Sequence, residues 1–107
     1  MDSENLVAGQ SYFIMSFYDH GFRTPEIRTV IYIGKNLLKQ GKKDEWYFQD
    51  ADSYIEYGSF FKLPKEMERV VHVMDEESLS LIRDLAGLIR DLTELKKGTY
   101  GRRPKDL

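Results

Sequence analysis

The sequence contains no cysteine and has few of the residues that usually mark a chemical site. Without cysteine there is no disulfide framework, no thiol nucleophile and no thiolate for a structural zinc site. Only two histidines are present, His20 and His72, and two imidazoles alone make a weak case for zinc. We therefore expect no metal and no cofactor, and a reducing cytoplasm as the location.

Long apolar runs are also lacking. No stretch approaches the roughly 18 apolar residues that a membrane-spanning helix needs. The first ten residues, MDSENLVAGQ, hold two acids and neither lysine nor arginine, which is unlike a secretory signal. These absences predict a protein without a membrane partner.

Catalytic signatures are missing as well. The glycines begin neither a GxGxxG nor a GxxxxGK phosphate loop, and no serine lies in a GxSxG elbow. Asp50, Asp52 and Glu56 are acidic enough for a hard cation, but their spacing is not that of a calcium loop. A carboxylate- or metal-dependent enzyme is therefore the least favoured of three functional hypotheses.

Charge is unevenly distributed, although the net charge is only −2. Residues 42–95 carry seven bases and thirteen acids (7 − 13 = −6), whereas residues 96–107 carry five bases and one acid (5 − 1 = +4). The basic residues of this end are Lys96, Lys97, Arg102, Arg103 and Lys105. The acidic body argues against duplex nucleic acid as the main partner. Glycine and proline near the end predict a basic, flexible tail over residues 98–107, after a single domain over residues 1–97.

Aromatic residues are abundant, and thirteen of the fourteen lie between Tyr12 and Phe61. Aromatic and β-branched residues favour sheets. Strands are predicted over residues 11–19, 27–34, 46–49 and 69–74, and the short polar connections favour an antiparallel meander of three to five strands, either open or barrel-like. Asp50 as N-cap and Gly58 as C-cap predict a short helix near residues 51–57.

The segment LIRDLAGLIRDLTEL, residues 81–95, repeats LIRDL after seven positions. With Asp75 as N-cap and Gly98 after Lys96 and Lys97, it predicts a long helix near residues 76–97. The fold class is therefore α+β, with this C-terminal helix packed on the antiparallel sheet.

The apolar side of this predicted helix is wider than docking on one sheet requires. It covers an arc of about 200°, whereas a single contact needs little more than 100°. One flank comprises Leu79, Ile82, Ala86 and Ile89. The other, a candidate interaction flank, comprises Leu81, Leu85, Leu88, Leu92 and Leu95. Either the short helix with Phe60, Phe61 and Leu63 covers this second flank, or a second chain does.

The aromatic residues allow a further interpretation. A platform of exposed rings could stack bases or hold a small ligand. Its candidates are Tyr12, Tyr18, Tyr32, Trp46 and Tyr47. The competing interpretation is that these rings fill the core and the sheet edges. In the fourth strand His72 alternates with Val71 and Val73, so it should point away from the core if the two valines face it.

The leading hypothesis is a small, non-catalytic protein–protein interaction module that binds itself or another protein, with homodimer formation through the C-terminal helix as its specific form. The alternative is nucleic-acid or small-ligand binding through the aromatic sheet face and the basic tail. No family resemblance is carried by these residues.

Overall fold

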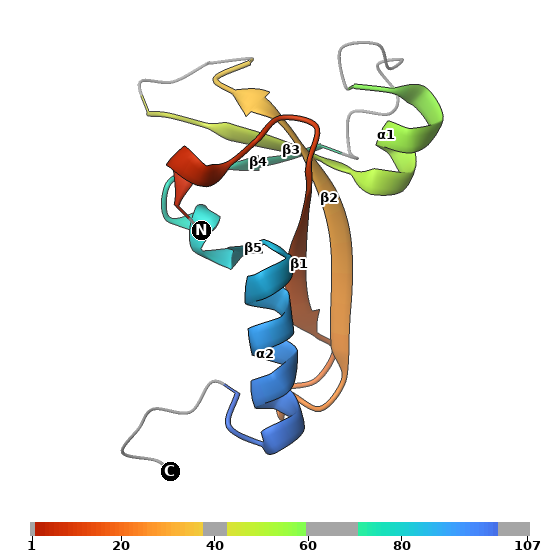
Figure 1. The fold of residues 1–107 in the computed structure, drawn as a ribbon, viewed down its shortest axis with the longest axis vertical. Helices are drawn as coiled ribbons and strands as arrows, with labels where there is room; N and C mark the ends of the chain where they lie inside the picture. Colours follow the sequence, from red (N-terminus) through yellow and green to blue (C-terminus); the bar gives the residue numbers. More distant parts are fainter. Residues whose placement is uncertain (1, 38–42, 60–70, 101–107) are drawn as a thin grey trace.

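The computed structural model describes residues 2–37, 43–59 and 71–100, which form an α+β fold (Figure 1). Its five antiparallel strands have the order β4-β3-β2-β1-β5. They are β1 (Ser11–Phe17), β2 (Pro25–Lys35), β3 (Trp46–Asp50), β4 (Val71–Met74) and β5 (Ile82–Arg83). The α-helices are α1 (Ala51–Tyr57) and α2 (Leu85–Lys97), and two 3₁₀ turns are η1 (Ser3–Asn5) and η4 (Ser78–Leu81).

The predicted α+β class and the antiparallel meander are confirmed. β1 to β4 follow one another as neighbours, and β5 returns to pair with β1. The sheet is not closed into a barrel, because β4 and β5 remain its two edges. In Figure 1 the β1–β2 hairpin runs along the molecule and β3 and β4 cross its upper end, so the sheet is strongly twisted.

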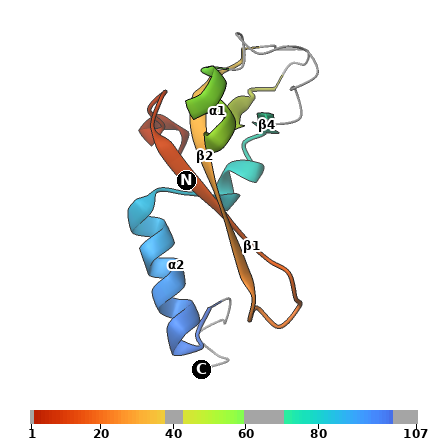
Figure 2. The same cartoon turned by 90° about the vertical axis from the view of Figure 1, so that its right-hand side faces the viewer.

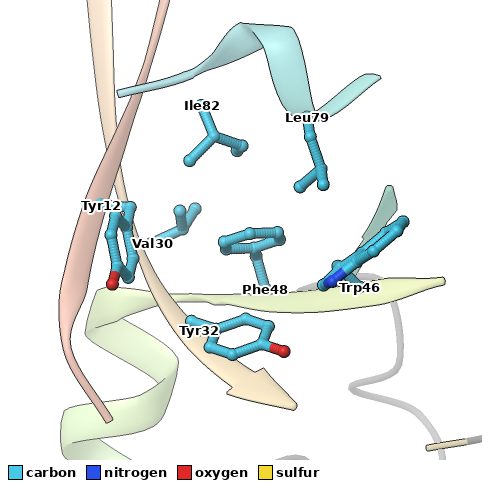
Figure 3. Packing of buried hydrophobic residues seen from close by; sticks show 7 residues of the cluster. All are labelled: Tyr12, Val30, Tyr32, Trp46, Phe48, Leu79 and Ile82. Atoms are coloured by element: carbon cyan, nitrogen blue, oxygen red, sulfur yellow. The ribbon is translucent and has the colours of Figure 1, made fainter. Parts of the chain in front are cut away.

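The core lies on one face of this twisted sheet. Phe48, which is fully buried, packs edge-on against Tyr12 and at a tilt against Tyr32 (Figure 3). The remaining members of the buried cluster are Val30, Trp46, Leu79 and Ile82. Leu79 and Ile82 come from η4 and β5, so the segment before α2 covers the side of the core opposite β3.

Tyr12 also fixes the N-terminal segment. Its hydroxyl accepts a hydrogen bond from the backbone N–H of Val7 at 2.8 Å and donates to the carbonyl of Asn5 at 3.4 Å. A buried phenol needs such partners, because an unpaired hydroxyl in the core would cost about 1–3 kcal/mol. The residues after η1 therefore pack beside the core.

A β-bulge in β2 bends the strand near its end. The register with β3 shifts between Tyr32 and Gly34, and Gly34 has φ of 144°, in the region that favours glycine. A Cβ at this position would lie 2.8 Å from Cδ2 of Leu37. The backbone conformation therefore favours glycine here, and a larger residue would also displace the side chain of Leu37.

Replacing Gly34 with alanine is expected to lower the free energy of unfolding by about 1–3 kcal/mol, because it adds steric overlap to backbone strain. Urea denaturation followed by circular dichroism measures the change. Gly9→Ala is the matched control, since Gly9 has φ of 89° but no neighbouring atom within 4 Å of its Cβ position. Equal losses for the two variants would show that the contact with Leu37 adds nothing.

Helix α1 matches the predicted bounds, and the backbone N–H of Gly58 closes it on the carbonyl of Tyr54. The predicted capping role of Asp50 is wrong. The Asp50 side chain makes no capping hydrogen bond and instead contacts His72.

The C-terminal helix ends where predicted, with Gly98 in the left-handed conformation. Its predicted start at residue 76 is wrong, because α2 begins at Leu85, where Asp84 accepts a hydrogen bond from the N–H of Gly87 at 2.7 Å. The Asp75 side chain instead accepts a hydrogen bond from the N–H of Ser78, the first residue of η4. Between η4 and α2, the chain extends along β1 as β5 and pairs with its backbone. This long-range pairing interrupts the helical pattern.

Candidate protein-binding surface

Helix α2 turns only part of its apolar arc towards the body of the protein. It lies beside the lower half of the β1–β2 hairpin (Figure 2). Leu88 is buried, with 7% of its surface exposed, and Leu92 and Leu95 are half-buried. Leu85 and Ile89, which are one turn apart, are 60% and 56% exposed. The helix therefore has apolar surface left over after docking.

An ion pair joins the polar side of the helix to β5. Nε of Arg83 in β5 donates a hydrogen bond to Oδ2 of Asp91 at 2.8 Å, and its Nη1 donates to the carbonyls of Ser80 and Ile82. Asp91 lies on the polar side of the helix, so this pair turns part of the polar side inwards. In the same orientation of the helix, the apolar residues Leu85 and Ile89 face outwards.

Gly87 allows the helix to approach Arg83. It is buried, and a Cβ at this position would lie 3.1 Å from Cδ of Arg83 and 3.2 Å from Oδ1 of Asp84. Any larger residue would press on both the ion pair and the N-cap. The glycine in the repeat therefore supports the close packing of α2 on β5.

The end of α2 is fixed by Tyr100, which was assigned to the flexible tail. Its ring centroid lies 5.2 Å from that of Phe17 and 5.9 Å from that of Phe22. Burial raises the pKa of the Tyr100 phenol, the nearby carboxylate of Asp91 raises it further, and Arg83 opposes them. Both ends of α2 are thus held, and its outward side is presented by a fixed helix.

We call this outward side the outer face of α2. Its apolar members are Leu85, Ala86 and Ile89, and its basic neighbours are Arg90, Lys96 and Lys97. Leu85 and Ile89 are 60% and 56% exposed, and Leu81, which precedes the helix in η4, is 57% exposed. Exposed apolar groups gathered on one side, with polar groups around them, are typical of a protein-binding surface.

The structure divides the predicted interaction flank. Leu85, Leu88, Leu92 and Leu95 lie on α2, but Leu88 is buried and Leu81 precedes the helix in η4. Ile89, which the helical pattern groups with Leu79, Ile82 and Ala86 outside the interaction flank, is exposed. Helical spacing cannot predict this, because it does not specify how a helix is rotated on its sheet.

The short helix does not cover the outer face. Figure 1 shows α1 at the opposite end of the molecule from α2. The other three predicted covering residues, Phe60, Phe61 and Leu63, lie outside the described residues.

Four of the five platform candidates do not present their rings to solvent. Tyr12, Tyr32, Trp46 and Tyr47 are buried, and only Tyr18 is exposed. Burial also raises the pKa of Tyr32. These residues therefore do not form an exposed stacking surface. Of the predicted basic tail, Lys96 and Lys97 are exposed in the last turn of α2, while Arg102, Arg103 and Lys105 lie outside the described residues.

The condition under which His72 would point away from the core, that Val71 and Val73 face the core, is not met. His72 stands opposite Phe48 in the β4–β3 pairing, so it lies on the same face of the sheet as the core, whereas Val73 is exposed. Its Nε2 lies 2.8 Å from Oδ1 of Asp50. Alternation along a short edge strand fixes which residues share a face but not which face is covered.

Across residues 2–37, 43–59 and 71–100, no three acidic or histidine side chains are grouped so that they could hold a metal ion. In the same part of the chain, no helix has the length and apolar character needed to cross a membrane. In comparisons with known proteins, no family model, no curated protein and no solved structure matches this chain.

Proposed function

We propose that this protein is a protein–protein interaction module that associates with a second copy of itself through the outer face of α2. The observation that carries the proposal is the exposure of Leu85 and Ile89 on a helix held at both ends. Burying one such side chain contributes about 1.5–3 kcal/mol. In a two-fold contact both copies bury their Leu85 and Ile89, so four such side chains contribute. This free energy offsets part of the cost of association.

The charges along α2 favour an antiparallel arrangement of the two copies. The helix begins with Asp84 at its N-cap and ends with Lys96 and Lys97. In an antiparallel pair, the basic end of each helix lies near the acidic beginning of the other, and the helix dipoles oppose each other. Leu85, Ile89 and Leu92 are spaced four and three residues apart, which suits a helix–helix seam in the middle of such a pair.

Light scattering behind a sizing column tests the proposal. The unmodified chain is expected to elute as a dimer at concentrations of hundreds of micromolar, and the double variant Leu85→Glu with Ile89→Glu as a folded monomer, because two charges per chain would be buried without partners. Circular dichroism checks the fold of the variant.

Ile55→Glu is the matched control. Ile55 is 81% exposed on α1, away from the outer face, so this variant should remain dimeric. A strictly monomeric unmodified chain would contradict self-association. A double variant that stays dimeric would show that another surface forms the dimer.

A further inference from the structure

A second feature of the molecule is a hollow on the core-facing side of the sheet, at the edge of the core. Its volume is about 250 Å³, and it is lined by Ile14, Ser16, Glu26, Arg28, His72 and Met74. Ile14 and Met74 pack against the buried cluster and form its apolar floor. The polar members come from β1, β2 and β4, so three strands build one site.

The polar residues of the hollow lie on the same face of the sheet as the core, at the next positions along the strands beyond it. Along β2 the side chains of Glu26, Arg28 and Val30 share one face, and Val30 is fully buried. Arg28 stands opposite Ile14, and Glu26 opposite Ser16, in the β1–β2 pairing. Arg28 and Glu26 thus lie next to the core on its own face of the sheet, beside the apolar residues of the hollow.

The His72 ring is held in place by Asp50. Nε2 and Oδ1 are 2.8 Å apart, and the two side chains are only 23% and 25% exposed. Asp50 occupies the N-cap position of α1, but its side chain makes no capping hydrogen bond. Its carboxylate is hydrogen-bonded to the imidazole of His72 instead. In the neutral ring, Nε2 donates its hydrogen to Asp50, and Nδ1 is left as an acceptor.

The two charged residues of β2 are only loosely paired. Nη2 of Arg28 and Oε1 of Glu26 are 3.7 Å apart, and both side chains are partly exposed. Such a pair is weak and exchanges readily for better partners. A simple anion would be attracted by Arg28 but repelled by Glu26. A simple cation would be attracted by Glu26 but repelled by Arg28. A ligand that carries both charges satisfies both groups.

We propose that this hollow binds a compact zwitterion, a free amino acid with an aliphatic side chain. Its carboxylate would bind the guanidinium of Arg28, its ammonium group would donate to Glu26 and Nδ1 of His72, and its side chain would lie on Ile14 and Met74. At about 30 Å³ for each water-sized group, the hollow holds about eight non-hydrogen atoms. L-valine has this size. The proposal does not depend on the outer face of α2, which contributes no lining residue.

Nuclear magnetic resonance of the full chain, labelled with ¹⁵N, tests the proposal with L-valine as the probe. Valine is expected to shift the amide signals of Arg28 and His72 with saturation in the millimolar range. Isovalerate lacks the ammonium group and isobutylamine lacks the carboxylate, so each should bind at least about tenfold more weakly, a loss of about 1.4 kcal/mol. Isovalerate binding as well as valine would overturn the zwitterion in favour of a plain anion site.

Variants locate the binding groups. Arg28→Gln and Glu26→Gln should each weaken valine binding at least about tenfold. Arg23→Gln, an exposed arginine in the β1–β2 turn, is the matched control and should bind valine unchanged. Unchanged binding by Arg28→Gln, or no shift of any signal at high valine concentration, would overturn the proposal.

Asp50 is a positioning residue in this site, because it acts through His72. In Asp50→Asn, the ring ¹⁵N signals of His72 should show a changed tautomer population together with weaker valine binding. A purely structural role for Asp50 would change stability and leave the tautomer signals and the binding of the folded protein unaltered. That result would show that Asp50 does not position His72 for binding.

Discussion

Replacing Phe48 with alanine is expected to lower the free energy of unfolding by about 3–5 kcal/mol. Phe48 is fully buried and its ring contacts those of Tyr12 and Tyr32, with β2 on one side of its strand and β4 on the other. The smaller residue loses the transfer free energy of the ring and leaves a cavity that strands fixed on both sides cannot close. The free energy of unfolding of a whole domain is about 5–15 kcal/mol, so the loss is a large part of its stability.

Chemical denaturation of the purified variant measures this loss. Ile55→Ala is the control, because Ile55 is 81% exposed and its truncation should change stability by no more than about 0.5 kcal/mol. If Phe48→Ala cost about as little as the control, the core would not be centred on β3. Tyr12 and Tyr32 would then need another packing partner.

Replacing Leu88 with glutamate is expected to lower the free energy of unfolding by more than about 3 kcal/mol, or to release α2 from the body of the protein. Leu88 is 7% exposed and lies on the side of α2 that packs on the sheet. A carboxylate there would lose its hydration without gaining a partner, and the apolar contact of the leucine would be lost as well. Release of α2 would also separate Tyr100 from Phe17 and Phe22.

Leu85→Glu is the matched control for this variant, since it makes the same change one turn earlier at a position 60% exposed. Its stability should stay within about 0.5 kcal/mol of the unmodified chain when both are measured at low concentration, where association contributes nothing. Limited proteolysis of the α2 segment reports its release. Equal destabilisation by the two variants would show that α2 packs with a different rotation.

Together with the association experiment, the comparison of Leu85 with Leu88 separates two roles within one apolar arc. The sequence groups these leucines in a single flank, but the structure assigns one to the surface and the other to the packed side. Variants of the outer face are expected to weaken association with little effect on the free energy of unfolding. Variants of the packed side are expected to lower the free energy of unfolding without removing an association contact.

The local elements could be predicted from the sequence because local signals specify them. β-branched and aromatic residues mark β1, β2 and β3, Gly58 marks the end of α1, and Gly98 ends α2 where a left-handed residue is needed. The antiparallel order followed from the short connections between successive strands. Each of these features depends on residues close together in the chain.

The start of α2 and the surface it exposes could not be predicted in the same way. Residues 76–84 follow a helical pattern, yet the two residues of β5 gain more from pairing with β1 than from continuing a helix. Ile89 is exposed in the orientation of α2 in which Asp91 pairs with Arg83, and the two residues of that pair lie on different elements. The inward position of His72 depends on which face of β4 the twisted sheet covers.

By itself, the sequence determined the fold class, four of the five described strands, the short helix and a terminal helix with more apolar surface than one sheet can cover. Only the tertiary structure decided which leucines of that helix remain exposed and which polar residues gather beside the core. The physical reason is that propensity and capping act within a few residues, whereas β-pairing, ion pairs and burial join residues far apart in the chain and outweigh local preference where they conflict.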